Sequence, residues 1–199
     1  MIFTTCKPLI LASASPRRRQ FLEDLGLAFS CRTADIDETP QPGESPAQFA
    51  LRMAETKARS LSVQHPGAFV IGADTIVSRD DTILGKPVDK LHALQMLHSL
   101  QGRTHQVITG LALFCLKENY AQSLTRTTEV IFGSFSDAIL QAYVETGEPM
   151  DKAGAYGIQG QGNFLIKTIK GSCSNVIGLP MNDCTAFLLD RGVITPLQP

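Results

Sequence analysis

A strand that leads directly into a helix near the start of the chain constrains the fold more than any other feature. Leu9–Ala12 is a short apolar run of the kind that forms a buried strand. Ser15 and Pro16 are residue types that begin a helix, and Gly26 ends the helical spacing of apolar residues that follows. The free backbone N–H groups at such a helix start bind anions readily, so this turn is a candidate anion site.

Two arginines stand in the first turn of the predicted helix, where cations oppose the helix dipole. The forked guanidinium donors of Arg17 and Arg18 match phosphate oxygens, and Ser13 adds a hydroxyl just after the strand. The pattern therefore indicates either a phosphate-binding turn or an ordinary capped helix with a solvated basic turn.

Strand and helix patterns alternate along the rest of the chain. Strand patterns occupy residues 29–34, 68–73, 75–78, 82–84, 107–116, 124–132 and 164–169. Helical patterns occupy residues 45–61, 89–100, 136–147 and 180–191, and residues 153–162 read as a glycine-rich loop. We predict an α/β fold with a mixed, twisted sheet and flanking helices in a single domain of residues 1–199. The hairpin of residues 75–84 could form a second lobe, with a central cleft between the two lobes.

Charge and cysteine content narrow the classes of partner and compartment. The net charge is −1 and 43% of the residues are hydrophobic, so the composition is globular and offers no basic field for nucleic acid. No apolar run approaches the ~20 residues that span a bilayer, so we expect no membrane partner. The five scattered cysteines include no C-x-x-C pair, and the start of the chain lacks a signal-peptide pattern. We therefore expect reduced thiols and a cytoplasmic protein.

Two carboxylates are candidates for metal binding or acid–base chemistry. Asp74 follows the buried strand predicted at residues 68–73, and functional groups of α/β sheets collect at such strand ends. It can hold a divalent cation or activate a water molecule. Glu38 lies in an irregular acidic segment whose carboxylates suit a hard cation. The alternatives are an aspartate that begins a turn and an acidic segment that is simply solvated.

Two lysines and one glutamine complete the candidate residues. Lys86 lies between Gly85 and Pro87, in a stiff segment with an accessible backbone, where an ammonium can act as a point charge on phosphate. Lys57 falls among the alanines of a helix stripe, so it either meets a buried partner or extends to solvent. Gln159, in the glycine-rich loop, can both donate and accept, which suits the edge of a pyrimidine base.

Taken together, these segments resemble the Maf family of septum-formation-inhibitor-like nucleoside triphosphate pyrophosphatases. The matching segments, in the family's order, are residues 13–18, 37–40, 57–58, 72–75, 85–87, 155–160 and 175–180. They run almost from end to end of the chain. The resemblance implies a two-lobed α/β fold of the Maf and inosine-triphosphatase type. It also implies hydrolysis of a nucleoside triphosphate to the monophosphate and pyrophosphate.

The resemblance also assigns roles by position. The implied catalytic residues are Asp74, Glu38 and Lys86, with Asp74 as the candidate proton acceptor. The implied substrate-binding residues are Ser13, Arg17, Arg18, Lys57, Thr75 and Gln159. A divalent cation such as Mg²⁺ or Mn²⁺ would be held by Asp74 and Glu38. The implied partner is a nucleoside triphosphate, and a homodimer is a possible assembly.

Three positions bear on the substrate branch within the family. The branch that acts on 7-methyl-GTP carries an aromatic residue, Gln and Glu at the positions of Arg17, Thr75 and Gln159. This chain instead resembles the branch that acts on dTTP and UTP, and the amide of Gln159 suits uracil and thymine. The functions left open are 7-methyl-GTP hydrolysis, hydrolysis of inosine or xanthosine triphosphates, and a nucleotide-binding regulator of septum formation without turnover.

Overall fold

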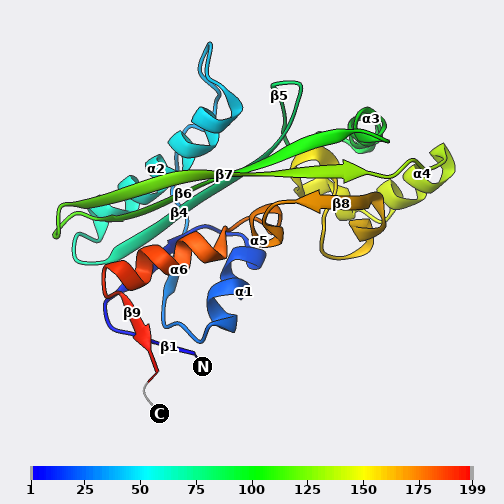
Figure 1. Cartoon of the computed structure of the whole chain (residues 1–199). Coiled ribbons are helices and arrows are strands. Elements are labelled where there is room, and N and C mark those ends of the chain that lie inside the picture. The colour runs from blue at the N-terminus through cyan, green and yellow to red at the C-terminus, as the bar shows by residue number, and fades with distance from the viewer. Residues whose placement is uncertain (1, 198–199) are drawn as a thin grey trace. The chain divides into compact units, whose positions relative to one another are not determined.

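The computed structural model of the chain describes residues 2–197 (Figure 1). The strands are β1 (Phe3–Thr5), β2 (Leu9–Ala12), β3 (Ser30–Arg32), β4 (Phe69–Arg79), β5 (Thr82–Leu84), β6 (Thr104–Cys115), β7 (Tyr120–Phe132), β8 (Ile166–Lys170) and β9 (Ile194–Pro196). The α-helices are α1 (Pro16–Asp24), α2 (Pro46–Gln64), α3 (Lys90–Leu100), α4 (Asp137–Glu145), α5 (Cys173–Ile177) and α6 (Met181–Asp190). The short 3₁₀ helices are η1 (Glu148–Asp151), η2 (Ala153–Ala155) and η3 (Gln161–Leu165).

The main sheet is mixed, as the sequence predicts. Its strands follow the order β3-β2-β4-β6-β7-β8, and β5 pairs with β4. β2 runs parallel to both β3 and β4, with Ile10 opposite Ser30 and Val70. β5 and β8 pair antiparallel with β4 and β7. β1 and β9 form a separate antiparallel pair that the sequence patterns did not predict, because a three-residue strand carries too little alternation.

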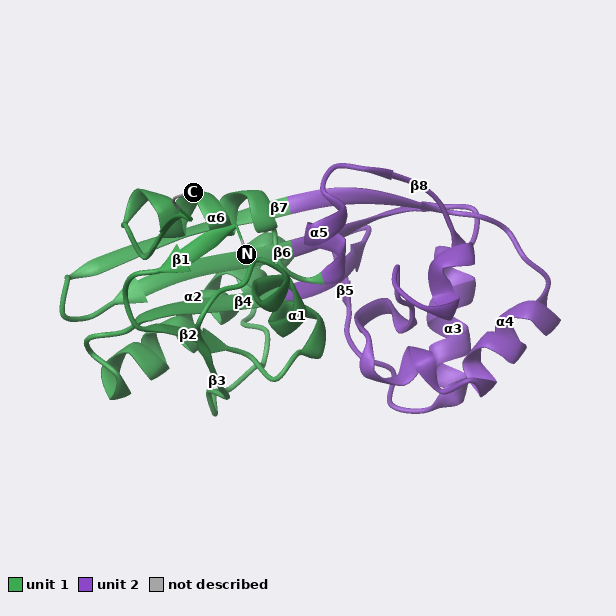
Figure 2. Cartoon of the chain, turned by 90° about the horizontal axis from the view of Figure 1, so that it is seen from below, with its two compact units in different colours: residues 1–74, 109–126, 178–199 green, residues 75–108, 127–177 purple. Residues whose placement is uncertain are grey.

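The chain divides into two compact units, each assembled from separated stretches (Figure 2). Unit 1 consists of Met1–Asp74, Thr109–Arg126 and Gly178–Pro199, and unit 2 consists of Thr75–Ile108 and Thr127–Ile177. The hairpin of residues 75–84 falls in unit 2, so the second lobe expected around it is confirmed. The central cleft and the single domain stay predictions.

In unit 1 the sheet has α2 on one face and α1 with α6 on the other (Figure 1). Successive side chains of a strand point to opposite faces. Leu11 shares a core cluster with Leu22 of α1 and Leu188 of α6, whereas Ile10 belongs to the cluster of Ala54 in α2. β2 is therefore buried on both faces, which explains why its sequence is continuously apolar.

Two glycines let α2 approach the sheet closely. A Cβ atom on Gly72 of β4 would lie 2.1 Å from the carbonyl oxygen of Ala54. One on Gly110 of β6 would lie 2.2 Å from the carbonyl oxygen of Ala50. Any larger residue at either position would push the helix away. The pair therefore holds α2 against the sheet beside Asp74, which follows Gly72 by two residues in β4.

In unit 2, α3, α4 and the 3₁₀ helices contribute to a core that includes Leu97, Phe132 and Leu140. The hairpin between β4 and β5 turns through Asp80 and Asp81, at φ +50° and +60°. A two-residue hairpin turn of type I′ needs positive φ at both central residues, and Asp tolerates it. The polar pair therefore marks the turn, as the sequence predicts.

The predicted helices begin at the residues that the sequence patterns indicate, but the side chain at the N-cap does not always form the capping hydrogen bond. Ser45 and Gln48 form a capping box at the start of α2, and the Asp89 side chain caps α3. Ser15 and Ser136 occupy the predicted N-cap positions of α1 and α4, yet neither side chain caps its helix. At α1 the hydroxyl of a neighbouring serine bonds the Ser15 N–H instead, as described below.

Two expectations are wrong. The strand expected to end before Asp74 continues to Arg79, so Asp74 lies inside β4 and does not begin a turn. Residues 153–162 are not a simple loop, because they contain η2 and the start of η3.

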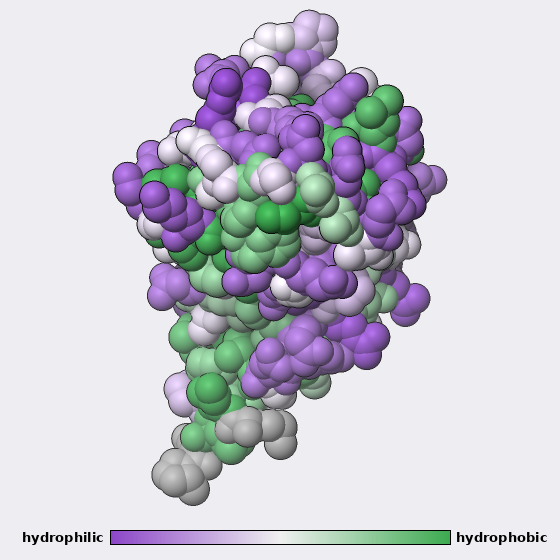
Figure 3. Space-filling view, turned by 90° about the vertical axis from the view of Figure 1, so that its right-hand side faces the viewer, coloured by the Kyte–Doolittle hydropathy of each residue, from purple (hydrophilic) through white to green (hydrophobic). Residues whose placement is uncertain are grey.

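No helix among residues 2–197 has the length and apolar character needed to cross a membrane. Hydrophilic residues cover much of the face drawn in Figure 3, and apolar residues gather near its centre. Exposed apolar side chains include Val88 and Phe164 of unit 2. Scattered exposed side chains of this kind are ordinary on protein surfaces.

Candidate active site

The start of α1 is organised around the buried hydroxyl of Ser13. Its Oγ accepts the backbone N–H of Ser15 at 3.1 Å and the Nη1–H of Arg18 at 3.3 Å. Arg18 is held further by its Nε, which donates to the Gly178 carbonyl at 2.7 Å. Because Ser13 Oγ accepts both of these bonds, its own O–H is available to donate to another acceptor. The α1 start therefore combines a fixed guanidinium with a hydroxyl donor.

Charges of both signs lie near the guanidinium of Arg18. Burial lowers the pKa of Arg18, and Arg17 lowers it too, whereas Asp74 and Glu38 raise it. An arginine keeps its charge under such influences. The positive charge at the α1 start therefore lies within electrostatic reach of both predicted carboxylates.

Lys57 joins the two carboxylates directly. Its Nζ lies 2.8 Å from Glu38 Oε1 and 2.7 Å from Asp74 Oδ1. The side chains of Lys57 and Asp74 are only 13% and 15% exposed, whereas that of Glu38 is 60% exposed. The alternative in which Lys57 extends into solvent is therefore wrong. The close approach of α2 at Gly72 places this lysine beside the carboxylate of β4.

The two carboxylates fit a divalent cation that arrives with a phosphate ligand. Mg²⁺ is commonly held by one or two carboxylates together with substrate phosphates and water, and Glu38 and Asp74 meet at one point through Lys57. Within residues 2–197, no three or more His, Cys, Asp or Glu side chains are grouped so as to hold a metal. The donor set thus suits a cation completed by phosphate oxygens, and the metal stays a prediction.

In unit 2, Glu148 organises the glycine-rich segment that carries Gln159. Its carboxylate accepts the N–H groups of Gln161 at 2.8 Å and Gly162 at 2.9 Å, and the hydroxyl of Tyr143 at 3.0 Å. The hydroxyl oxygen of Tyr143 accepts the N–H of Gly157 at 3.3 Å. The backbone is thus held on both sides of Gln159, whose own side chain is exposed.

A buried cluster of three aromatic rings, those of His105, Phe132 and Tyr156, anchors the start of the same segment. Tyr156 Oη and His105 Nε2 are 2.7 Å apart, and both rings meet Phe132 edge to face. Burial lowers the pKa of His105 to about 4 and raises the pKa of Tyr156. The imidazole is therefore neutral at physiological pH, and the pair has a structural role.

The two other predicted residues of unit 2 are Lys86 and Thr75. Lys86 is exposed between β5 and α3. The preceding carbonyl, that of Gly85, accepts the N–H of Gly154 at 3.0 Å, which ties the lysine's segment to the glycine-rich segment. Gly154 has φ +71°, and a Cβ there would meet Val77 at 3.0 Å. Thr75, half-buried, follows Asp74 in β4.

The nine predicted residues fall into two sets. Unit 1 contains six of them: Ser13, Arg17, Arg18, Glu38, Lys57 and Asp74. Unit 2 contains the other three: Thr75, Lys86 and Gln159. Within unit 1, ion pairs join Lys57 to both carboxylates, and a hydrogen bond joins Ser13 to Arg18.

Sequence reasoning missed the residues that support these two sets. Arg52 and Glu44 brace the segment of Glu38, and Glu148 and Tyr143 brace that of Gln159. The only local signals are weak. Arg52 lies on a helix that is otherwise apolar on its inner face, and Glu148 lies between a glycine and a proline. Neither signal identifies a partner.

Comparison with known proteins assigns the chain to a family. The chain matches the family described as Maf-like protein over residues 8–191. A dTTP/UTP pyrophosphatase of Desulfotalea psychrophila is 51% identical over 189 residues, which cover 95% of this chain and 97% of the relative. A dTTP/UTP pyrophosphatase of Nitratidesulfovibrio vulgaris is 48% identical over 193 residues, or 96% and 91% of the two chains. A third, of Myxococcus xanthus, is 46% identical over 188 residues, or 94% of each chain. The chain therefore belongs to the Maf family.

Proposed function

We propose that this protein hydrolyses dTTP and UTP to the nucleoside monophosphates and pyrophosphate. The relatives that match nearly its whole length bear the name dTTP/UTP pyrophosphatase. The observation that carries the proposal is the cluster in unit 1. There Lys57 joins Asp74 to Glu38, within electrostatic reach of the guanidinium at the α1 start. A cluster of this kind suits a highly charged phosphate substrate.

The reaction can be assigned to residues of this cluster. The N–H groups at the α1 start, together with Ser13, Arg17 and Arg18, bind and neutralise the triphosphate. Asp74 orients a water molecule and accepts its proton as the water oxygen attacks the α-phosphorus. The bond from the α-phosphorus to the bridging oxygen breaks, and pyrophosphate leaves. Lys57 holds the Asp74 carboxylate in place, since its ammonium lies 2.7 Å from Oδ1.

A divalent cation would be held by Asp74 and Glu38 together with phosphate oxygens, and would neutralise the charge of the phosphates. Lys86 would add a further point charge to the phosphates. Phosphoryl chemistry of this kind depends mainly on positioning and electrostatic stabilisation, which the charged residues supply.

Gln159 is the proposed reader of the base. Its amide can donate to O2 or O4 and accept the N–H of uracil or thymine. Arg17, Thr75 and Gln159 together favour the pyrimidine branch of the family. The second candidate function is 7-methyl-GTP hydrolysis by the same cluster, and the third is a regulator of septum formation that binds nucleotides without turnover.

A substrate panel tests the proposal. The purified chain with Mg²⁺ is incubated with dTTP, UTP, 7-methyl-GTP, ITP and XTP, and the inorganic products are identified. We expect pyrophosphate from dTTP and UTP with the highest kcat/KM. Orthophosphate as the sole inorganic product would refute cleavage between the α- and β-phosphates. Full activity in excess chelator would refute the dependence on a divalent cation. A preference for 7-methyl-GTP would move the chain to the other branch, and binding without turnover would favour the regulator.

The compartment and the assembly are further proposals. All five cysteines are free thiols, which fits a reducing compartment such as the cytoplasm. A homodimer follows only from the family resemblance. Light scattering of the purified chain, with and without nucleotide, would test it.

A further inference from the structure

We infer that Arg52 and Glu44 form a clamp that positions Glu38 for the divalent cation. The inference rests on the proposed function, because it takes Glu38 as a cation ligand. We call residues 35–44 the acidic loop. This segment contains no helix or strand, so its shape depends on side-chain contacts.

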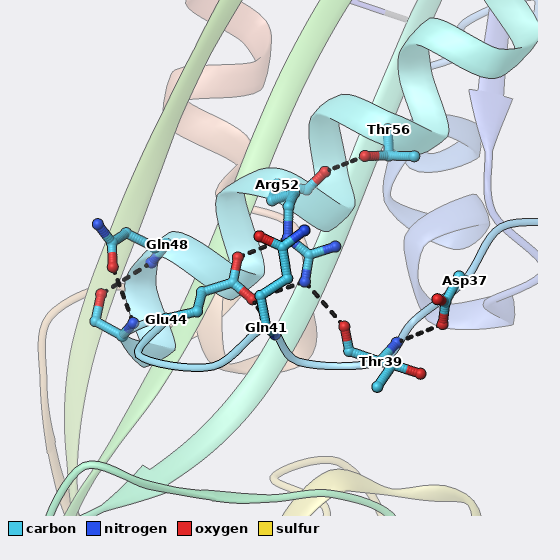
Figure 4. Close-up of polar contacts among 8 residues, drawn as sticks. Asp37, Thr39, Gln41, Glu44, Gln48, Arg52 and Thr56 are labelled. Atoms are coloured by element: carbon cyan, nitrogen blue, oxygen red, sulfur yellow. Dashed lines mark hydrogen bonds and ion pairs between the residues drawn. The ribbon is translucent and has the colours of Figure 1, made fainter.

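Arg52 contacts the acidic loop at two points (Figure 4). Its Nε and Nη2 donate to the two carboxylate oxygens of Glu44, each at 2.6 Å. Its Nη2 also donates to the carbonyl oxygen of Thr39 at 3.0 Å. The forked pair fixes distance and orientation together, because both donors lie in one plane. Thr39 is the residue after Glu38, so the clamp acts one peptide unit from the proposed ligand.

The clamp is partly shielded from water. The side chain of Glu44 is 8% exposed and that of Arg52 is 26% exposed. Arg52 lowers the pKa of Glu44, and Glu44 raises the pKa of Arg52. Glu44 also accepts the N–H of Gln41 at 3.0 Å. The same carboxylate therefore holds the backbone near the end of the loop. A paired and buried carboxylate of this kind makes a firmer brace than an exposed ion pair does.

Arg52 and Lys57 lie on the same helix, α2, and both contact the acidic loop. Lys57 contacts Glu38 itself, but that carboxylate is 60% exposed, and an exposed ion pair contributes little to holding a loop. A cation that binds Glu38 would also compete with Lys57 for the carboxylate. The clamp would then be the contact that keeps Glu38 in place. Arg52 is therefore a positioning residue, which touches neither cation nor substrate.

The direct test measures cation affinity, not turnover. Mn²⁺ binding is followed by electron paramagnetic resonance in the presence of uridine 5′-(α,β-imido)triphosphate, which cannot be cleaved at the reacting bond. We expect Arg52→Gln and Glu44→Gln to weaken Mn²⁺ binding by about 10-fold or more, the range found when supports of metal ligands are removed. Arg52→Lys should weaken it nearly as much, because lysine lacks the fork.

Arg126→Gln is the matched control. Arg126 makes an equally forked pair with Asp183, at 2.8 and 2.5 Å, in the same unit and away from the acidic loop. Because the Arg126 side chain is 52% exposed, Arg126→Gln should lower Tm less than Arg52→Gln does, and it should leave Mn²⁺ affinity unchanged. Wild-type Mn²⁺ affinity in folded Arg52→Gln and Glu44→Gln would overturn the inference, as would equal weakening in the control.

Two further outcomes separate the clamp from the proposed function. A wild-type chain that binds Mn²⁺ with the analogue but hydrolyses no nucleotide would refute the function and leave the clamp to be judged by affinity. A wild-type chain that binds no Mn²⁺ would overturn the inference itself. If Arg52→Gln fails to fold, Arg52→Lys and Glu44→Gln decide the outcome, since both are smaller changes.

Discussion

Two loops of this protein are each braced by a glutamate, and the bracing chemistry differs. In unit 1 the acidic loop is held by Glu44, whose carboxylate pairs with the guanidinium of Arg52. In unit 2 the glycine-rich segment is held by Glu148, whose carboxylate accepts backbone N–H groups of Gln161 and Gly162. Burial raises the pKa of Glu148, but the N–H groups of Gly162 and Gln161, the Tyr143 hydroxyl and the charge of Lys152 together keep the pKa below its ordinary value.

The difference follows from what each loop presents. The acidic loop presents a carboxylate, so a charged fork set on a rigid helix holds it against the pull of a cation. The glycine-rich segment presents the uncharged amide of Gln159, and the bonds from backbone N–H groups to Glu148 hold its main chain. On the proposed function, cation binding and base recognition are therefore supported by separate sets of contacts. Changes in unit 1 should therefore alter cation use and kcat, and changes in unit 2 should alter base preference.

The largest expected effect is on kcat, from Asp74→Asn. The amide keeps the shape of the side chain and can still accept from Lys57, but it cannot take the proton of water. We expect kcat for UTP to fall by about 100-fold or more, the scale for loss of a general base. Circular dichroism should show an unchanged fold. Near wild-type turnover in a folded variant would remove Asp74 from the chemistry.

Next in size is a change of base preference from Gln159→Glu. A carboxylate facing O2 or O4 of a pyrimidine repels it, and one mismatched polar contact costs ~1–3 kcal/mol, or roughly 5- to 150-fold in kcat/KM. The measurement compares UTP, dTTP and 7-methyl-GTP in both proteins. Inorganic triphosphate serves as the control ligand, since it has no base and should bind both equally. An unchanged ranking would exclude Gln159 from base recognition.

Glu148→Gln separates the two braces. Glutamine keeps one acceptor oxygen but turns an N–H₂ group toward the backbone donors of residues 161–162, so an unsatisfied contact arises. We expect the free energy of unfolding to fall by about 2 kcal/mol. KM for UTP should rise while Mn²⁺ affinity stays at the wild-type value, the reverse of the result expected for Arg52→Gln. If both variants weaken Mn²⁺ binding alike, the division between the two loops is wrong.

The smallest expected effect is a pH dependence of stability from His105. Its pKa is about 4 in the folded chain, and an unfolded histidine has a pKa of about 6.5. Between these values the unfolded chain binds the proton and the folded chain does not, so stability falls as pH falls. From pH 6.5 to 5 the loss should be about 1.5 kcal/mol. Denaturant titrations at several pH values measure it, and His105→Gln should remove this slope.

Sequence patterns were enough for the elements with a strong local signal. β2 and the start of α1 lie where the apolar run and Ser15-Pro16 indicate, and the predicted apolar stripe of α2 is buried. The resemblance supplied nine site residues, and six of them fall in unit 1, where Lys57 pairs with both carboxylates and Ser13 bonds Arg18. Local patterns succeed here because burial and helix capping depend on near neighbours in the chain.

The failures have a common cause. The uninterrupted course of β4 through Asp74 depends on its neighbours in the sheet, which residues 68–78 do not reveal. The pairing of β1 with β9 joins segments near opposite ends of the chain. Neither could follow from a local window, because the stabilising contacts come from residues distant in sequence.

The sequence by itself determined the positions of the longer strands and helices, the family, and the residue types proposed to bind phosphate and base. Only the tertiary structure decided that Lys57 meets both carboxylates, that Arg52 braces Glu44, and that Glu148 holds the backbone beside Gln159. The physical reason is that a charge or a donor is visible in the chain, but its partner is not. Partners are chosen by packing, as where Gly72 lets α2 settle against β4 and brings Lys57 to the carboxylate of Asp74.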